Sequence, residues 1–413
     1  MPLIGKAPMI DPISLRSAGG SPAVFGVPRK TFGCRRIVGL GVLCLLALAL
    51  TSCATKPQPR ATATASATPD IPEKDKVLWQ YRTALMAMRK GNFAEAKSNL
   101  DAAIARISNI LGKDESARKA RGYFNPEAKK TFIGEPYERV MAYYYRGILY
   151  WMDGELDNAR ACFRSAELED SDTVDKKYSS DYVLLDYLDG LASLKLSGDG
   201  SDALKRATQE AKISAPPPYN PKANMLLFVD FGAGPTKYAV GRYNELLMFR
   251  HGPSPARTVQ VQIDGQTYQV RPYDDLYFQA TTRGGRVMDH ILANKASFKE
   301  GTDVGGTTAL ITGGVLTTSG QRDAQYAGLG LLAAGLISKI VSASTVPAAN
   351  IRSWDNLPLY LGFAAFELPP GKHTATIDFL DEQNRKLNGY TKTVSFEIIP
   401  GKDQVVYLSD KSS

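Results

Sequence analysis

Cysteine and histidine are scarce, since the chain has four cysteines and three histidines in 413 residues. No second ligand stands at metal spacing from His251, His290 or His373, and no paired-cysteine, calcium-loop or His-Glu-x-x-His pattern is present. Gly-x-Ser-x-Gly is absent, and no Gly-Lys-Ser/Thr follows the glycine pairs at 305–306 and 313–314. The sequence therefore predicts no metal, cofactor, nucleotide or recognisable catalytic residue, and structural or incidental roles for the histidines.

The N-terminus carries an apolar run that is short for a permanent membrane span. Residues 37–50 follow a basic segment, 29–36, and lead into Leu50-Thr51-Ser52-Cys53. At about 1.5 Å per residue this run falls short of a hydrocarbon core of about 30 Å, so the pattern indicates a cleaved signal. Leu-Thr-Ser-Cys resembles the bacterial lipobox, which implies cleavage before Cys53 and acyl chains on its thiol. Residues 1–52 are thus predicted to be a signal peptide with a dispensable N-terminal extension.

Cleavage would change the charge and the cysteine content. Residues 1–52 contain six Lys or Arg and one Asp, so the net charge falls from +8 to +3 over the remaining 361 residues. This is too little to predict a nucleic-acid partner. Besides the acylated Cys53 only Cys162 remains, which excludes an internal disulfide, and we expect its thiol to be packed on a helix.

Residues 53–72 predict a lipidated cysteine followed by a disordered tether. They are rich in Pro, Thr and Ala, and 19 residues of flexible coil span roughly 25 Å. Ala54 follows the cysteine, whereas an Asp there would resemble the inner-membrane retention signal of enteric bacteria. We therefore expect a lipid anchor in the cell outer membrane, with the folded chain on the periplasmic face.

Residues 73–214 predict helical repeats. The segment 91–96, Gly-Asn-Phe-Ala-Glu-Ala, returns as Gly-Glu-Leu-Asp-Asn-Ala at 154–159, and a looser unit turns at 198–203. Gly147, Tyr150 and Phe163 stand at a spacing that resembles the tetratricopeptide repeat. The interval of 63 residues between the first two turns predicts an insertion near 113–136.

The resemblance to tetratricopeptide repeats implies a concave surface that binds a protein partner. The alternative is that the insertion or the neighbouring domain fills this groove, and the sequence does not decide between them. By position, the groove-lining residues are Leu78, Tyr81, Leu85, Met88, Met141, Tyr144, Ile148 and Trp151.

After a proline-rich linker at 215–222, residues 223–409 predict a strand-rich domain, with a tail at 410–413. Asp264-Gly265 between two alternating runs is a strong hairpin signal. The last four predicted strands read as an antiparallel meander or small sandwich, and a helix is expected at 287–296. The strands are expected at 223–231, 259–263, 267–271, 359–367, 374–380, 393–399 and 404–408.

An insert at 303–345, rich in Gly, Ala and Thr, interrupts this domain. Small residues fall at every fourth position, and its second half adds an apolar stripe, so we expect a helical hairpin. Three roles for this hairpin are open: it covers the sheet, it contacts another subunit or partner and so allows oligomerisation, or it inserts into lipid. The stripe comprises Leu329, Leu332, Ala333, Leu336, Ile337, Ile340 and Val341.

One short run suggests an anion site. Arg283, Gly284, Gly285 and Arg286 precede the expected helix, and two guanidinium groups beside free backbone N–H groups suit a carboxylate or phosphate. The alternative is a tight turn whose arginines pair with neighbouring aspartates.

The whole chain predicts an α+β multidomain protein, with a helical tetratricopeptide-like solenoid followed by an antiparallel sheet or sandwich. With residues 352–358, Arg-Ser-Trp-Asp-Asn-Leu-Pro, it resembles a family of uncharacterised, repeat-containing bacterial lipoproteins. Members are often encoded near lipoproteins that activate penicillin-binding proteins, so the resemblance implies an envelope role. The leading hypothesis is a non-catalytic protein-binding or assembly factor. The alternatives are a peptidoglycan-acting enzyme, recognisable by two carboxylates with perturbed pKa values across a cleft, and a structural oligomer subunit.

Overall fold

The fold is known from a computed structural model that describes residues 71–111, 130–171, 179–281 and 348–412. Several predictions fall outside these ranges: the signal peptide at 1–52, the acylation of Cys53, the tether, most of the insertion near 113–136, the anion site at 283–286, the helix at 287–296 and the insert at 303–345. Within the described residues the protein has a mixed α+β fold, as the sequence predicts.

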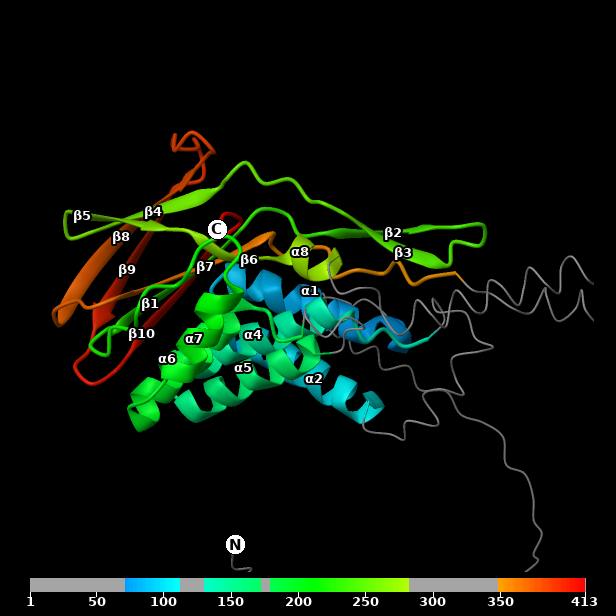
Figure 1. The fold of residues 1–413 in the computed structure, drawn as a ribbon, viewed down its shortest axis with the longest axis horizontal. Helices are drawn as coiled ribbons and strands as arrows, with labels where there is room; N and C mark the ends of the chain where they lie inside the picture. The colour runs from blue at the N-terminus through cyan, green and yellow to red at the C-terminus, as the bar shows by residue number, and fades with distance from the viewer. Residues whose placement is uncertain (1–70, 112–129, 172–178, 282–347, 413) are drawn as a thin grey trace, which may run out of the picture. The chain divides into compact units, whose positions relative to one another are not determined.

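The N-terminal part of the described chain is built from helices that pack in consecutive pairs, α1 with α2, α4 with α5, and α6 with α7 (Figure 1). The turns after α1 and α4 and the C-cap of α6 use Gly91, Gly154 and Gly198, whose φ angles of 71°, 80° and 84° favour glycine. A 3-10 turn at Glu73–Asp75 precedes helices α1 (Lys76–Arg89), α2 (Phe93–Leu111), α4 (Pro136–Met152), α5 (Leu156–Asp170), α6 (Val183–Ser197) and α7 (Ser201–Glu210).

Small residues bring the paired helices close together. A Cβ atom on Gly147 of α4 would lie 2.5 Å from the Phe163 ring of α5, so only glycine admits that ring. Between α6 and α7, a Cβ on Gly200 would lie 2.1 Å from the carbonyl oxygen of Gly190. At the α4–α5 contact, a small residue on one helix thus makes room for an aromatic ring on the other.

The strands form two four-stranded sheets and one two-stranded ribbon. In the first sheet, ordered β10-β1-β7-β6, β1 pairs in parallel with β10 and antiparallel with β7. The second sheet, ordered β5-β4-β8-β9, is antiparallel, and β2 pairs with β3 separately. The first five strands are β1 (Met225–Phe231), β2 (Thr236–Val240), β3 (Leu246–Arg250), β4 (Thr258–Ile263) and β5 (Gln266–Val270). Then follow β6 (Pro272–Asp275), helix α8 (Leu276–Thr281), β7 (Tyr360–Phe366), β8 (Gly371–Leu380), β9 (Lys392–Ile398) and β10 (Gln404–Ser409).

The predicted Asp-Gly hairpin is confirmed, because β4 and β5 pair across Asp264 and Gly265, both at positive φ. Of the two predicted arrangements of the last four strands, the meander is wrong, because only β8 and β9 are neighbours while β7 and β10 flank β1 in the other sheet. The alternative of a small sandwich is closer, since the two sheets share a hydrophobic core. The β2–β3 ribbon and the short strand β6 were not predicted. Sequence alternation predicts the strands but not which pairs form, because pairing depends on contacts far apart in the chain.

Strand β1 lies at the centre of three layers, with helices on one side of the first sheet and the second sheet on the other (Figure 1). Leu226 and Phe228 belong to the core shared with the helices. The alternate side chains, Met225, Leu227 and Val229, belong to the core between the sheets. All seven residues of β1 are buried, which explains why six of them are apolar and only Asp230 is charged. The helices and sheets of the described residues thus share a hydrophobic core and belong to one compact unit.

Candidate functional site

The predicted partner groove is filled by the protein's own sheet. All eight of the groove residues named in the sequence analysis are at most 5% exposed. They lie in one hydrophobic cluster with Phe228 of β1 and Phe363 of β7, and the indole N–H of Trp151 donates to Asp403 before β10 (2.9 Å). The prediction of an open groove is therefore wrong for this structure, and the alternative that the neighbouring domain fills it is what the contacts show.

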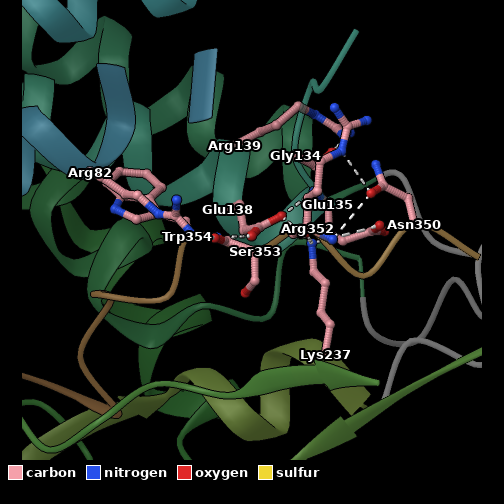
Figure 2. Close-up of polar contacts among 10 residues, drawn as sticks. All are labelled: Arg82, Gly134, Glu135, Glu138, Arg139, Lys237, Asn350, Arg352, Ser353 and Trp354. Atoms are coloured by element: carbon pink, nitrogen blue, oxygen red, sulfur yellow. Dashed lines mark hydrogen bonds and ion pairs between the residues drawn. The ribbon is translucent and has the colours of Figure 1, made fainter. Parts of the chain in front are cut away.

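A buried ion pair joins the first turn of α4 to strand β2. The Nζ of Lys237 lies 2.5 Å from Oε2 of Glu138, and their side chains are 1% and 0% exposed. Glu138 also accepts the backbone N–H groups of Glu135 and Trp354, each at 2.7 Å (Figure 2). Its two oxygens therefore hold three donors from three separate parts of the chain. The pair fits a structural lock, since a buried charge persists when it is paired and hydrogen-bonded.

The surroundings of Lys237 complete its coordination. Its Nζ also donates to the carbonyl of Arg352 (3.1 Å) and stands 5.6 Å and 5.7 Å from the ring centroids of Phe132 and Tyr137. The ammonium group is thus surrounded by the carboxylates of Glu138 and, at 3.9 Å, Glu135, together with a carbonyl and two aromatic faces, all of which favour a cation. These neighbours satisfy the charge of the ammonium group without a further ligand.

Residues 350–357, which we call the strap, run from this junction along α1. The guanidinium of Arg352 donates to Asp75 (2.6 Å), to the carbonyl of Lys130 (2.8 Å) and to Asn350 (2.9 Å). Figure 2 shows Arg352 and Asn350 side by side with the Glu138–Lys237 pair. The first half of the strap is therefore fixed to the segments that begin α1 and α4.

The second half of the strap is held by α1 itself. The Trp354 ring stacks on Tyr81 at a centroid distance of 4.3 Å and is 1% exposed. Arg82 donates to both oxygens of Asp355 (2.8 and 2.9 Å), and Arg89 donates to the carbonyl of Asn356 (2.7 Å). Residues 352–358, Arg-Ser-Trp-Asp-Asn-Leu-Pro, thus supply the side chains and carbonyl groups that attach the strap to the helices.

A second buried cluster lies where β1 meets α4 and β10. Asp230 is 0% exposed, and its Oδ2 accepts the hydroxyl groups of Tyr145 (2.6 Å) and Tyr407 (3.1 Å). Burial raises the pKa of Asp230 to about 7, although both tyrosine hydrogen bonds lower it. Its Oδ1 has no hydrogen-bond partner among the described residues. The cluster is a polar contact inside the shared core.

Asp274 of β6 caps helix α6 from outside that helix. Its two oxygens accept the N–H groups of Val183 and Leu184, each at 2.9 Å. Burial raises the pKa of Asp274 to about 7, against the lowering effect of these two hydrogen bonds. A carboxylate at a helix N-terminus satisfies donors that the helix leaves free, so this perturbed group has a structural role.

The most perturbed carboxyl pair lies between α5 and α6. Burial first, and then the charge of Asp186, raise the pKa of Glu167 to about 8, and the two side chains share a hydrogen bond. Arg206 of α7 binds Asp186 (2.8 Å), and Arg164 binds Asp189 (2.9 Å). This pair has the perturbed pKa values expected of the enzyme alternative, but it stands between packed helices and is bound by an arginine.

The remaining candidates from the sequence have structural contacts. His373 on β8 bridges Asp264 at the hairpin turn (2.7 Å) and the carbonyl of Pro369 (2.8 Å). His251 lies against the Tyr277 ring, 4.9 Å between centroids. Burial raises the pKa of the Cys162 thiol to about 11, so this thiol is a poor nucleophile near neutral pH. His290 and the run 283–286 lie outside the described residues.

Glu138 and Lys237 were not among the residues predicted from the sequence. Glu135 and Glu138 form a capping box at the start of α4 with Pro136 between them, and Glu-Pro-x-Glu is a readable signal for such a start. No comparable signal identifies Lys237, because one lysine in a short alternating strand ordinarily faces water.

No protein-family model, curated protein or solved structure matches the chain. In the part of the chain that the structure describes, no three or more His, Cys, Asp and Glu side chains gather as metal ligands would. The same residues include no helix with the length and apolarity to cross a membrane.

Proposed function

We propose that this protein is a membrane-anchored lipoprotein of the cell envelope that acts as a non-catalytic protein-binding or assembly factor. Its anchor is the acylated Cys53, on the periplasmic face of the outer membrane, and its paired helices are tetratricopeptide-like repeats. The N-terminal signal pattern supports the anchor. The buried Glu138–Lys237–Trp354 junction, which fastens the helices to the sheet, supports a rigid body that presents its outer surfaces to a partner.

The filled groove changes where a partner would bind. Because Tyr144 and its neighbours pack on the sheet, we propose that the partner contacts the outer faces of the helices instead. Leu168 on α5 is 74% exposed, the largest value among the exposed apolar side chains of the described residues. An exposed side chain of this kind can contribute to an interface, whereas the buried groove residues cannot without opening the core.

The test uses the full chain in its own cell. A photoreactive amino acid is placed at Leu168 or, as the buried control, at Tyr144, and captured proteins are identified by mass spectrometry. We expect one recurrent envelope protein from position 168 and intrachain products alone from position 144. The mass of the N-terminal peptide reports acylation of Cys53, with Cys53→Ser as the control that should leave the membrane fraction. An intact leader with a free thiol would refute the anchor.

The Glu167–Asp186 pair favours one second candidate, an envelope enzyme acting on peptidoglycan. Acid–base hydrolysis generally uses two carboxyl groups of which one is protonated, and burial raises the pKa of Glu167 to about 8. Incubation of purified chain with peptidoglycan decides it. Release of muropeptides that is lost in Glu167→Gln would establish the enzyme, and no release from either chain would favour the binding factor.

A further inference from the structure

The β2–β3 ribbon has one packed face and one exposed face. Leu247 and Ala239 are directly paired and contact Ala349, and Phe249 on the same face meets Tyr137 of α4 edge to face at 5.8 Å. On the opposite face, Tyr238 pairs with Met248 and Val240 pairs with Leu246. Val240, Leu246 and Met248 are 37%, 41% and 44% exposed and form an apolar surface at the turn end of this outer face, while Arg250 lies over the Tyr238 ring at the other end.

Such a surface is unusual on an isolated ribbon. Three of the nine exposed large apolar side chains in the described residues lie on this face, so the exposure is concentrated rather than scattered. Two strands alone are marginally stable in water, and contiguous apolar patches generally mark a contact with something else. Figure 1 shows the ribbon extending away from the other strands. The outer face of the ribbon therefore calls for an occupant.

Both ends of residues 282–347 meet this ribbon. The residues just before this range form helix α8 (Leu276–Thr281), which contacts β3. On the other side Ala349 donates its N–H to the carbonyl of Asn244 at the turn of the ribbon (2.7 Å) and packs on Leu247. The 66 residues between them thus leave and return beside the same two strands.

We propose that the outer face of the β2–β3 ribbon is covered by the chain's own apolar stripe at residues 329–341. The stripe supplies Leu332, Leu336 and Ile340, which match the apolar character of Val240, Leu246 and Met248. A segment tethered at both ends has an effective concentration of about millimolar at the ribbon, which a second copy or another partner reaches only at high abundance. The contact does not depend on the lipid anchor.

The test compares the labelling rates of two positions in the full chain that are both occupied by methionine and are similarly exposed. Met86 on α1 is 47% exposed and Met248 is 44% exposed. Met86→Cys and Met248→Cys are labelled with a maleimide, and labelling is counted by mass spectrometry on the peptide that carries each position, so other cysteines do not contribute. We expect residue 248 to react about tenfold more slowly, as a site protected by local closure does. Adding Leu336→Asp and Ile340→Asp should bring residue 248 to the rate of residue 86.

Equal labelling rates at positions 86 and 248, measured in chains whose insert is unchanged, would overturn the proposal. Slow labelling that persists with the two aspartates would overturn it as well, and protection lost on dilution or in detergent would assign the face to a second copy or to lipid. A second measurement leaves the insert unchanged: a photoreactive amino acid at position 248 should capture peptides from 326–345 of the same chain. Capture of lipid or of another molecule alone would contradict the proposal.

Discussion

The two ends of the strap are both held by ion pairs, and the two pairs differ in their exposure to water. At one end Glu138 and Lys237 are 0% and 1% exposed, and Glu138 holds two backbone donors besides. At the other end Arg82 and Asp355 are 39% and 56% exposed. Removing one member of a buried pair leaves a charge without water or partner, whereas an exposed charge is simply hydrated again. Similar distances therefore conceal different contributions to stability.

The largest expected effect is the loss of Lys237. Lys237→Met leaves Glu138 buried without its cation, and we expect the free energy of unfolding to fall by about 3–5 kcal/mol. Urea denaturation followed by circular dichroism measures it.

The double variant Glu138→Gln with Lys237→Met is the control for that result. The amide oxygen that replaces the carboxylate can still accept the N–H of Trp354. The remaining carboxylate near position 237, that of Glu135, is 13% exposed, so part of the lost stability should return. If both variants were destabilised equally, packing rather than charge would account for the junction.

The Asp230 cluster should produce a pH dependence of nearly the same size. The folded pKa is about 7, above the value of about 3.9 in an unfolded chain, so the folded state binds more protons between these values. Stability should thus fall as the pH rises from about 4 to 7, by up to about 4 kcal/mol from this group.

Asp230→Asn should remove that part of the fall, because its amide oxygen accepts from Tyr145 and Tyr407 without titrating. Asp274, whose pKa is also raised to about 7, contributes a slope that remains in this variant. Parallel pH profiles for the two chains, from denaturation at each pH, would show that Asp230 titrates normally in the folded protein.

Gly147→Ala tests a buried contact without any charge. The new methyl group would stand 2.5 Å from the Phe163 ring, and we expect a loss of about 1–3 kcal/mol by overpacking. Adding Phe163→Leu should recover part of this loss. An unchanged midpoint for Gly147→Ala would mean that α4 and α5 separate easily.

The smallest effect belongs to the exposed end of the strap. Arg82→Met should lower the free energy of unfolding by about 0.2–1 kcal/mol, since its pair with Asp355 is hydrated and screened. High salt should reduce the difference from the parent chain. A loss as large as that of Lys237→Met would erase the contrast between the two ends.

Local signals in the sequence predicted local structure well. The glycines at 91, 154 and 198 and the Asp264-Gly265 hairpin depend on neighbouring residues and fixed turn geometry. The parallel pairing of β10 with β1 was not predicted, and the sequence left open whether a partner, the insertion or the neighbouring domain fills the helical groove. Those contacts join residues far apart in the chain, 252 positions in the case of Trp151 and Asp403, and an apolar stripe does not specify what covers it.

The candidate site shows the same limit. Trp354 and Arg352 were noticed in the sequence through a resemblance, but their partners Tyr81, Asp75 and Glu138 lie more than two hundred residues away. The alternation in β2 gives no sign that Lys237 faces inward.

The central claim is that helices and sheets unfold as one body, and amide hydrogen exchange of the native chain tests it most directly. We predict that the slowest amides of α1, α4 and β1 open with the same free energy, equal to that of global unfolding, because these elements share one core. Opening of α1 and α4 at a clearly lower free energy than β1 would contradict it, and the groove would then be free to admit a partner.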